Sequence, residues 1–150
     1  MLRTKECGEL HEESIGSQPT LTGWVSRRRD HGGVIFVALR DRSGIVQVVF
    51  DPETAPQAYE IADQFRSEWV VQVKGTVRVR PPGSENPAME TGMIEVAADE
   101  AAVLNPSLTP PFYISDDVEV DESLRLRYRY LDLRRPAMLR NLVLRPKVVK

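Results

Sequence analysis

The sequence of 150 residues predicts a mainly β protein, in which a five-stranded barrel has a helix between its third and fourth strands and is followed by a short helical hinge. Three observations lead to this fold class. Apolar and polar residues alternate with period two over several short segments. Turns that contain Gly, Pro, Asp or Ser separate those segments. One segment with helical spacing of its apolar residues interrupts the series after the third strand.

The first three strands are expected in the first third of the chain, where two short turns break the alternation. A glycine pair in the first turn supplies the backbone freedom that a tight reversal needs. Strict alternation in the first strand places Arg27 and Arg29 on the side of Val25. The expected strands are 20–29, 34–40 and 45–50, and the expected turns are 30–33 and 41–44.

A helix is expected after the third strand, because apolar residues recur at helical spacing from Ala58 to Phe65. Thr54 is the expected N-cap of this helix. Alternation returns over 69–79 and again, after a Pro/Gly-rich loop, over 93–104. Three strands, a helix and two strands follow one another in the order of the oligonucleotide-binding (OB) barrel.

We expect three parts in the chain: a barrel at residues 1–105, an extended linker at 106–122 and a helical hinge at 123–150. Prolines and a run of acidic side chains predict the extended linker. Arg and Tyr residues are frequent in the hinge, which is expected to form two helices. Pro146 is expected to kink or end the second of them.

The net charge of −2 hides an uneven distribution of charged side chains. Residues 121–150 contain nine Lys or Arg and three Asp or Glu, which leaves eleven basic and nineteen acidic residues in the rest of the chain. A barrel with a negative balance does not attract polyanions through its overall field. Any nucleic acid that binds the barrel therefore has to do so at a local patch of arginines.

Several other classes of protein are not expected. The chain has a single cysteine, Cys7, which excludes a disulfide framework. It has only two histidines besides, so neither a zinc site nor another metal site is expected. The N-terminus lacks the apolar region of a signal peptide, and no apolar run approaches the roughly 18 residues of a membrane span. We therefore expect a cytoplasmic protein with a reduced thiol and no membrane contact.

Side chains suited to reading single-stranded RNA gather on the first three expected strands. Phe36 offers a ring on which a base can stack, and Gln47 offers an amide that both donates and accepts. Arg27 and Arg29 share a strand face and can hold a phosphate or a guanine edge. The pattern alone also allows a core position for Phe36, a solvent-facing position for Gln47 and ordinary solvated arginines.

Three stretches carry a resemblance to a known family: GWVSRRRDHGGVIFVALRDRSGIVQVVFDP at 23–52, ETGMIEVAA at 90–98 and LRLRYRYLDLRRP at 124–136. Over nearly the whole chain, the sequence resembles the N-terminal anticodon-binding domain and hinge of bacterial aspartyl-tRNA synthetases. The resemblance implies that the anticodon loop of tRNA binds the barrel. It implies further that Phe36 lies under the central anticodon base and that Gln47 reads the uracil there. The other implied RNA-binding residues are Arg27, Arg29, Asp30, His31, Arg78 and Arg80.

Two residues near the first turn leave alternatives open. Asp30 either accepts a hydrogen bond from a base or only begins the turn. In the family this turn lies close to the third anticodon base, which differs between the tRNAs for aspartate and asparagine. Enzymes strict for aspartate tRNA often have leucine there, so His31 is similar to the relaxed type that charges both tRNAs. The alternative is an exposed histidine without effect on specificity.

The resemblance also implies a longer parent enzyme with a class II catalytic domain, which uses ATP and Mg²⁺ and forms a homodimer. Residues 123–150 would be the hinge and the start of that domain, and the rest of it is absent from this chain. We assign no catalytic residue and no cofactor to the chain itself. Its expected partners are the tRNA anticodon loop and the parent's own catalytic domain. Alone, it is expected neither to activate aspartate nor to charge tRNA.

Two other functions stay open at this point. A sequence-tolerant single-strand-binding protein uses the same barrel, but it needs several aromatic side chains and a basic body. A free-standing regulatory paralogue would have kept the fold and lost the enzyme. Selective binding to an anticodon loop distinguishes the ligase module from the first alternative, and the continuation of the reading frame past Lys150 decides the second.

Overall fold

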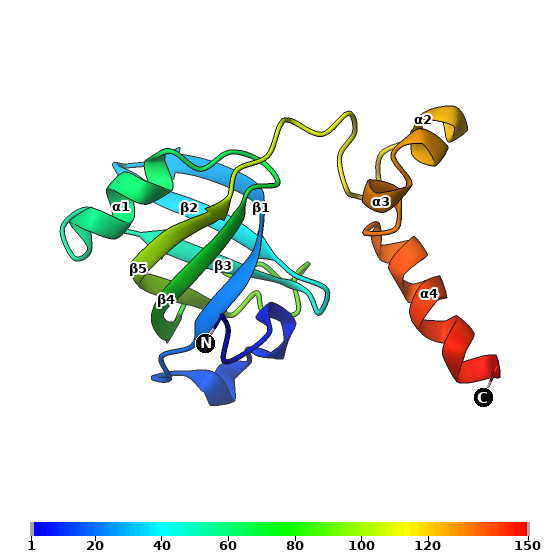
Figure 1. The fold of residues 1–150 in the computed structure, drawn as a ribbon. Helices are drawn as coiled ribbons and strands as arrows, with labels where there is room; N and C mark the ends of the chain where they lie inside the picture. The colour runs from blue at the N-terminus through cyan, green and yellow to red at the C-terminus, as the bar shows by residue number, and fades with distance from the viewer. Residues whose placement is uncertain (1, 150) are drawn as a thin grey trace. The chain divides into compact units, whose positions relative to one another are not determined.

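The computed structural model describes residues 2–149 and places a closed five-stranded β-barrel in the first part of the chain (Figure 1). Its elements are β1 (Thr20–His31), β2 (Val34–Arg40), β3 (Ile45–Phe50), α1 (Pro56–Asp63), β4 (Val70–Val79) and β5 (Ile94–Asn105). Around the barrel the strands follow the order β1, β2, β3, β5, β4. Neighbours are antiparallel except β3 and β5, which run parallel. The predicted fold class is confirmed.

Apolar side chains fill the barrel because each strand turns every second residue inward. In β2, Ile35, Val37 and Leu39 are fully buried, whereas the residues between them are only half-buried. The same core contains Val46, Val48 and Phe50 from β3, Val71, Val73 and Val77 from β4, and Ile94 and Val96 from β5. Each such side chain contributes roughly 1.5–3 kcal/mol through its removal from water. The alternation thereby fixes which residues of β2 and β3 remain on the outer face.

The hairpin of β1 and β2 turns at Gly32 and Gly33, whose φ angles are +60° and +79°. Two successive positive φ values make a type I′ turn, which matches the twist of the two strands and favours glycine. Consequently His31 still pairs with Val34, and β1 reaches His31 instead of ending at the predicted Arg29.

An irregularity in β1 changes the face on which its arginines lie. Val25 and Arg27 pair with consecutive residues of β2, so Ser26 is an extra residue that bulges from the ladder. Beyond the bulge, Arg27 and Arg29 are exposed on the outer face, whereas Val25 is fully buried. The prediction from strict alternation, which placed all three on one side, was wrong because a single extra residue reverses the faces.

Helix α1 packs against β5 and adds Ala58 and Ala62 to the barrel core. Its N-cap is Ala55, not the predicted Thr54, and Pro56 occupies the first helical position. Proline is favoured there because its fixed φ suits a helix and its missing N–H has no helical partner to lose. Thr54 therefore lies one residue too early to cap the helix.

Two 3-10 turns, η1 (Cys7–Glu9) and η2 (Glu12–Ser14), precede the barrel. The backbone N–H of Cys7 donates to Asp41 Oδ2 over 2.8 Å, which fixes η1 to the turn between β2 and β3. Cys7 is fully buried. Burial and the neighbouring Asp41 carboxylate raise the pKa of its thiol, so the thiol is a neutral core group.

Residues from 110 onward form a second compact unit, which contains α2 (Glu122–Arg127), α3 (Arg129–Asp132) and α4 (Pro136–Val149). Helix α4 runs through Pro146, so this proline does not end it. A proline inside a helix removes one backbone hydrogen bond, and the three residues that follow Pro146 remain helical here. Across residues 2–149, the structure contains no helix that is both long and apolar enough to cross a membrane.

A buried carboxylate organises the second unit. Asp132 has no exposed surface, and its two oxygens accept from Arg125 Nε over 2.8 Å and from Arg129 Nη1 over 2.6 Å. The hydrogen bond from Arg125, together with the positive charges around it, lowers the pKa of the Asp132 carboxyl despite its burial. The arginine density of the hinge therefore has a structural role in this unit.

Candidate nucleic-acid interface

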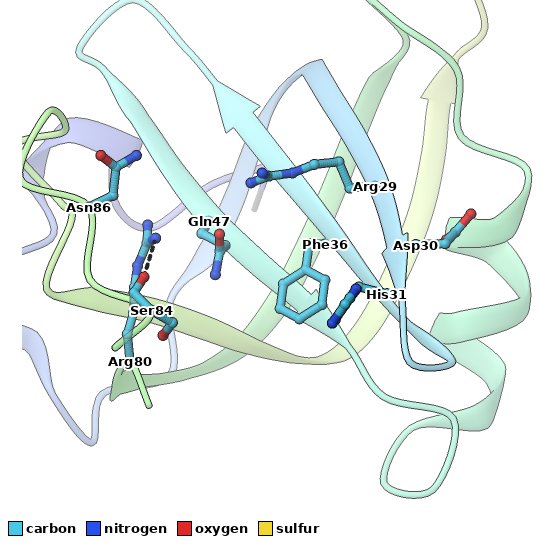
Figure 2. Close-up of a pocket in the computed structure, with 8 residues that line it drawn as sticks. All are labelled: Arg29, Asp30, His31, Phe36, Gln47, Arg80, Ser84 and Asn86. Carbon is cyan, nitrogen blue, oxygen red and sulfur yellow. Dashed lines mark hydrogen bonds between the residues drawn. The ribbon is translucent and has the colours of Figure 1, made fainter. Parts of the chain in front are cut away.

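A pocket of about 660 Å³ opens on the outer face of the first three strands, beside the loop that joins β4 to β5 (Figure 2). Its lining residues are Arg29, Asp30, His31, Phe36, Gln47, Arg80, Ser84 and Asn86. Six of them are among the eight residues singled out from the sequence as RNA-binding candidates. The structure thus collects side chains from β1, β2 and β3 in one concave site.

Strand pairing sets the central side chains in two adjacent rows. One row consists of Arg29, Phe36 and Val49, and the other of Arg27, Ala38 and Gln47, on β1, β2 and β3 in each case. Phe36 lies between the buried Ile35 and Val37, so its ring faces outward. A core position for Phe36, which the sequence pattern allowed, is therefore excluded.

Gln47 is held from behind by a buried carboxylate. Its Nε2 donates to Glu95 Oε2 over 2.9 Å, and Glu95 is 1% exposed. Arg78 compensates this carboxylate, because its Nε and Nη2 each lie 2.9 Å from Glu95 Oε1. Gln47, Glu95 and Arg78 therefore form one network that joins β3, β5 and β4.

Arg80 is buried at the edge of the pocket and is 4% exposed. Its Nε donates to the carbonyl of Ile94 over 2.9 Å and its Nη1 to the carbonyl of Ser84 over 3.4 Å, the bond drawn in Figure 2. Burial lowers the pKa of Arg80, an effect that nearby Glu95 opposes and Arg29 reinforces. An arginine remains charged under such a shift. Arg80 is thus a fixed cation that also holds the β4–β5 loop.

The carboxylate of Asp30 is directed away from the other labelled side chains of the pocket (Figure 2). It forms an ion pair with Arg28 over 3.1 Å, and Arg28 also donates to Asp63 and to the carbonyl of Ala62. Arg28 therefore ties the end of α1 to β1. Asp30 lies within β1, so it does not begin the turn, and its carboxylate is already engaged with Arg28.

Two of the predicted candidates do not line the pocket. Arg27 is exposed on the same outer face as Arg29 but lies one row away, opposite Ala38. Arg78 directs its guanidinium at Glu95. Arg27 is thus exposed outside the pocket, whereas the guanidinium of Arg78 pairs with the carboxylate that also accepts from Gln47.

Ser84, Asn86 and Glu95 were not singled out from the sequence. The first two come from the loop PPGSENP, whose turn residues predict a loop but give no sign of where it lies. Gly92 determines the shape of that loop, because a Cβ there would lie 1.8 Å from the carbonyl oxygen of Asn86. Glu95 could have been found from the sequence, because it is a charged residue between two core residues of β5, and a charge in such a place needs a buried partner.

The site combines three kinds of chemistry. Phe36 provides a flat apolar surface, Gln47 provides an amide, and Arg29 and Arg80 provide two cations. This set suits a planar base joined to a phosphate. Among residues 2–149, no group of three or more His, Cys, Asp or Glu side chains is placed to hold a metal ion.

A model of the OB-fold nucleic acid binding domain family matches residues 20–109, more than half of the chain and all five strands. The chain belongs to this family. The chain is 59% identical over 149 residues to an Aspartate–tRNA(Asp/Asn) ligase of Dehalococcoides mccartyi, an alignment that covers 99% of this chain and 25% of that protein. The chain thus spans about a quarter of the length of this curated relative.

Solved structures resemble the chain in the same way. An asparaginyl-tRNA synthetase from Pyrococcus horikoshii is 28% identical, with a TM-score of 0.74, and the match covers 91% of this chain and 31% of that one. A putative aspartyl-tRNA synthetase from Leishmania major is 27% identical, also with a TM-score of 0.74, over 88% of this chain and 28% of that one. In both, the match is to a minor part of a longer chain.

Proposed function

We propose that this OB-fold domain recognises a tRNA anticodon loop as the N-terminal part of an aspartate–tRNA ligase. The observation that carries the proposal is the pocket in which the outward ring of Phe36, the anchored amide of Gln47 and the guanidinium of Arg29 meet. The name of the 59% identical relative, Aspartate–tRNA(Asp/Asn) ligase, supports tRNA as the ligand of this domain and aspartate as the amino acid of the parent enzyme.

Binding would use the three kinds of group in separate roles. An anticodon base splayed out of the loop stacks on Phe36, and the amide of Gln47 bonds the edge of that base. Arg29 and Arg80 face the phosphate backbone, and Arg27 extends the positive surface by one row. His31, at the rim of the pocket, meets the neighbouring base. Asp30 and Arg78 act indirectly, through their ion pairs with Arg28 and Glu95.

Catalysis belongs to the rest of the parent enzyme in this proposal. ATP and Mg²⁺ would be bound by the part of the ligase that corresponds to the unmatched three quarters of the relative. The parent would be a cytoplasmic homodimer in which this domain delivers the tRNA to its own catalytic domain. The 150-residue chain alone is expected to show no aspartate-dependent pyrophosphate exchange.

One titration tests the proposal. The 150-residue chain is mixed with fluorescent RNA stem-loops that carry the anticodon GUC or the same loop bases in scrambled order, and with poly-dT as a third ligand. Preferential binding of the GUC loop is expected, because the pocket reads a base edge as well as a stack. Equal binding of all three ligands would favour a sequence-tolerant single-strand binder instead and would overturn anticodon recognition.

A further inference from the structure

The hydrogen bond between Gln47 and Glu95 fixes the direction of an amide that would otherwise be free to rotate. One N–H of Gln47 Nε2 points at Glu95 Oε2, 2.9 Å away. A carboxylate oxygen only accepts, so the reverse orientation would bring two acceptors together in a buried place. Arg78 occupies the other oxygen of Glu95 over 2.9 Å and fixes the carboxylate in turn. Gln47 Oε1, which accepts from no group among residues 2–149, is left on the side of the pocket.

The direction of this amide matters because uracil and cytosine differ by the exchange of donor and acceptor. Uracil presents an acceptor at O4 next to a donor at N3, and cytosine presents a donor at N4 next to an acceptor at N3. An amide whose oxygen meets position 3 and whose second N–H meets position 4 pairs with uracil. The same amide has to turn over to pair with cytosine. A freely turning glutamine therefore accepts both bases, and an anchored one does not.

We propose that Glu95 is a positioning residue that makes the pocket select uracil over cytosine, by holding Gln47 with its carbonyl oxygen toward the bound base. The inference rests on the proposed anticodon recognition and adds to it the source of the pyrimidine selectivity. Glu95 does not need to touch the RNA for this role. It lies beneath Gln47, is 1% exposed and does not line the pocket.

The test compares stem-loops that differ only in the central base, GUC and GCC, on the 150-residue chain and its Glu95→Gln variant. The wild type is expected to prefer GUC by about ten-fold or more, the discrimination typical of one bidentate base contact. A glutamine at 95 both donates and accepts, so it accommodates either orientation of Gln47. The variant is therefore expected to bind GCC more tightly than the wild type does, and the ratio of the two affinities falls toward one.

A matched control is Glu100→Gln on the same strand. Glu100 forms an exposed ion pair with Lys74 over 2.9 Å and is absent from the pocket, so this variant should keep the wild-type ratio. A Glu95→Gln variant that loses affinity for both RNAs equally, or for GUC alone without any gain for GCC, would overturn the positioning role. A wild type that binds neither RNA would instead overturn the proposed function, and one that binds GUC and GCC equally while it still prefers GUC to the scrambled loops would overturn the inference alone.

A second measurement decides the inference if the Glu95→Gln variant does not fold. In the wild-type protein, the side-chain amide protons of Gln47 should exchange with water more slowly than those of Gln57, which is exposed on α1. NMR resolves the two amides, and a Gln47→Ala spectrum assigns the first. Exchange of Gln47 as fast as that of Gln57 would mean that the amide is not held, and the inference would be wrong.

Discussion

Arg29 lies directly opposite Phe36 in the antiparallel pair of β1 and β2. The bulge at Ser26 produces this alignment, because without the extra residue Arg29 would turn toward the barrel interior. OB barrels bind single strands with such a pair of groups: the outward aromatic ring stacks on a base, and the neighbouring cation attracts the phosphate backbone. The bulge is therefore part of the construction of the site.

The first prediction concerns the ring of Phe36. Phe36→Ala removes the stacking surface and should weaken binding of the GUC stem-loop by about 1–3 kcal/mol, the usual value for one stacked base. The free energy of unfolding should change little, because the side chain faces outward and is only half-buried. Fluorescence anisotropy measures the first quantity, and urea denaturation measures the second.

Phe50 is the matched control for that substitution. It is fully buried and packs edge-on against Phe65 with 5.8 Å between the ring centroids. Phe50→Ala should lower the free energy of unfolding by about 3–5 kcal/mol. If Phe36→Ala were as destabilising as Phe50→Ala, the ring of Phe36 would be a structural side chain and not a stacking platform.

The second prediction concerns Arg80, which is both a cation of the pocket and the support of its loop. Arg80→Met keeps the apolar stem of the side chain but leaves the carbonyl of Ile94 without its donor. Loss of a buried hydrogen-bond partner costs about 1–3 kcal/mol, which urea denaturation should detect. RNA affinity should fall as well, because Ser84 is no longer held at the pocket.

Arg42 provides the comparison for Arg80. It is an exposed arginine that forms an ion pair with Glu6 over 3.0 Å, away from the pocket. Exposed ion pairs contribute little to stability, so Arg42→Met should change neither the unfolding curve nor the RNA affinity. If Arg80→Met and Arg42→Met changed the unfolding curve and the RNA affinity by the same amounts, Arg80 would act only through net charge.

Sequence periodicity predicted most of the fold because the barrel is built from local alternation. The limits of β2 and β3 agree with the pattern, since turn residues bound both apolar runs. Alternation did not predict the bulge at Ser26. A bulge depends on how two strands pair, and no residue in β1 marks the position by itself.

The candidate site was predicted in part for the same reason. The pattern singled out Phe36, Gln47 and Arg29 by their side chains, but it left the face of Phe36 open, and the bulge reversed the face expected for Arg29. Asn86 and Glu95 reach the site through the closure of β5 onto β3, a contact between segments almost fifty residues apart. Pairing of this kind depends on the whole barrel, and so local reasoning cannot place its partners.

The third prediction concerns acid and the second unit. The pKa of Asp132 is lowered in the folded chain by its hydrogen bond from Arg125 and by the charges around it. Its contribution to stability is therefore fully present above the unfolded value of about 3.9 and is lost as the pH falls through the lower folded value. NMR signals of α2 and α3 should move toward random-coil positions over that acid range.

Two substitutions separate Asp132 from other carboxylates of the unit. Asp132→Asn should loosen α2 and α3 already at neutral pH, because a neutral amide oxygen is a weaker acceptor for Arg125 and Arg129. Glu119→Gln removes an exposed carboxylate from the same unit and should leave the acid response as it is. An Asp132→Asn variant with the wild-type acid response would assign that response to another group.

The last prediction concerns His31 and how strictly the pocket selects among anticodons. His31 is exposed at the end of β1, on the rim of the pocket and next to the type I′ turn, so its side chain can change without a change in the barrel.

In the proposed function His31 faces the third anticodon base, which is C in the GUC loop for aspartate and U in the GUU loop for asparagine. An imidazole can donate or accept at one of its nitrogens and so tolerates either base, whereas a leucine offers no hydrogen bond and leaves discrimination to shape. His31→Leu should therefore alter the ratio of GUC to GUU affinity, measured on the 150-residue chain, while its unfolding curve stays that of the wild type. His11→Leu, outside the pocket, is the control, and an unchanged ratio in His31→Leu would remove His31 from the determinants of specificity.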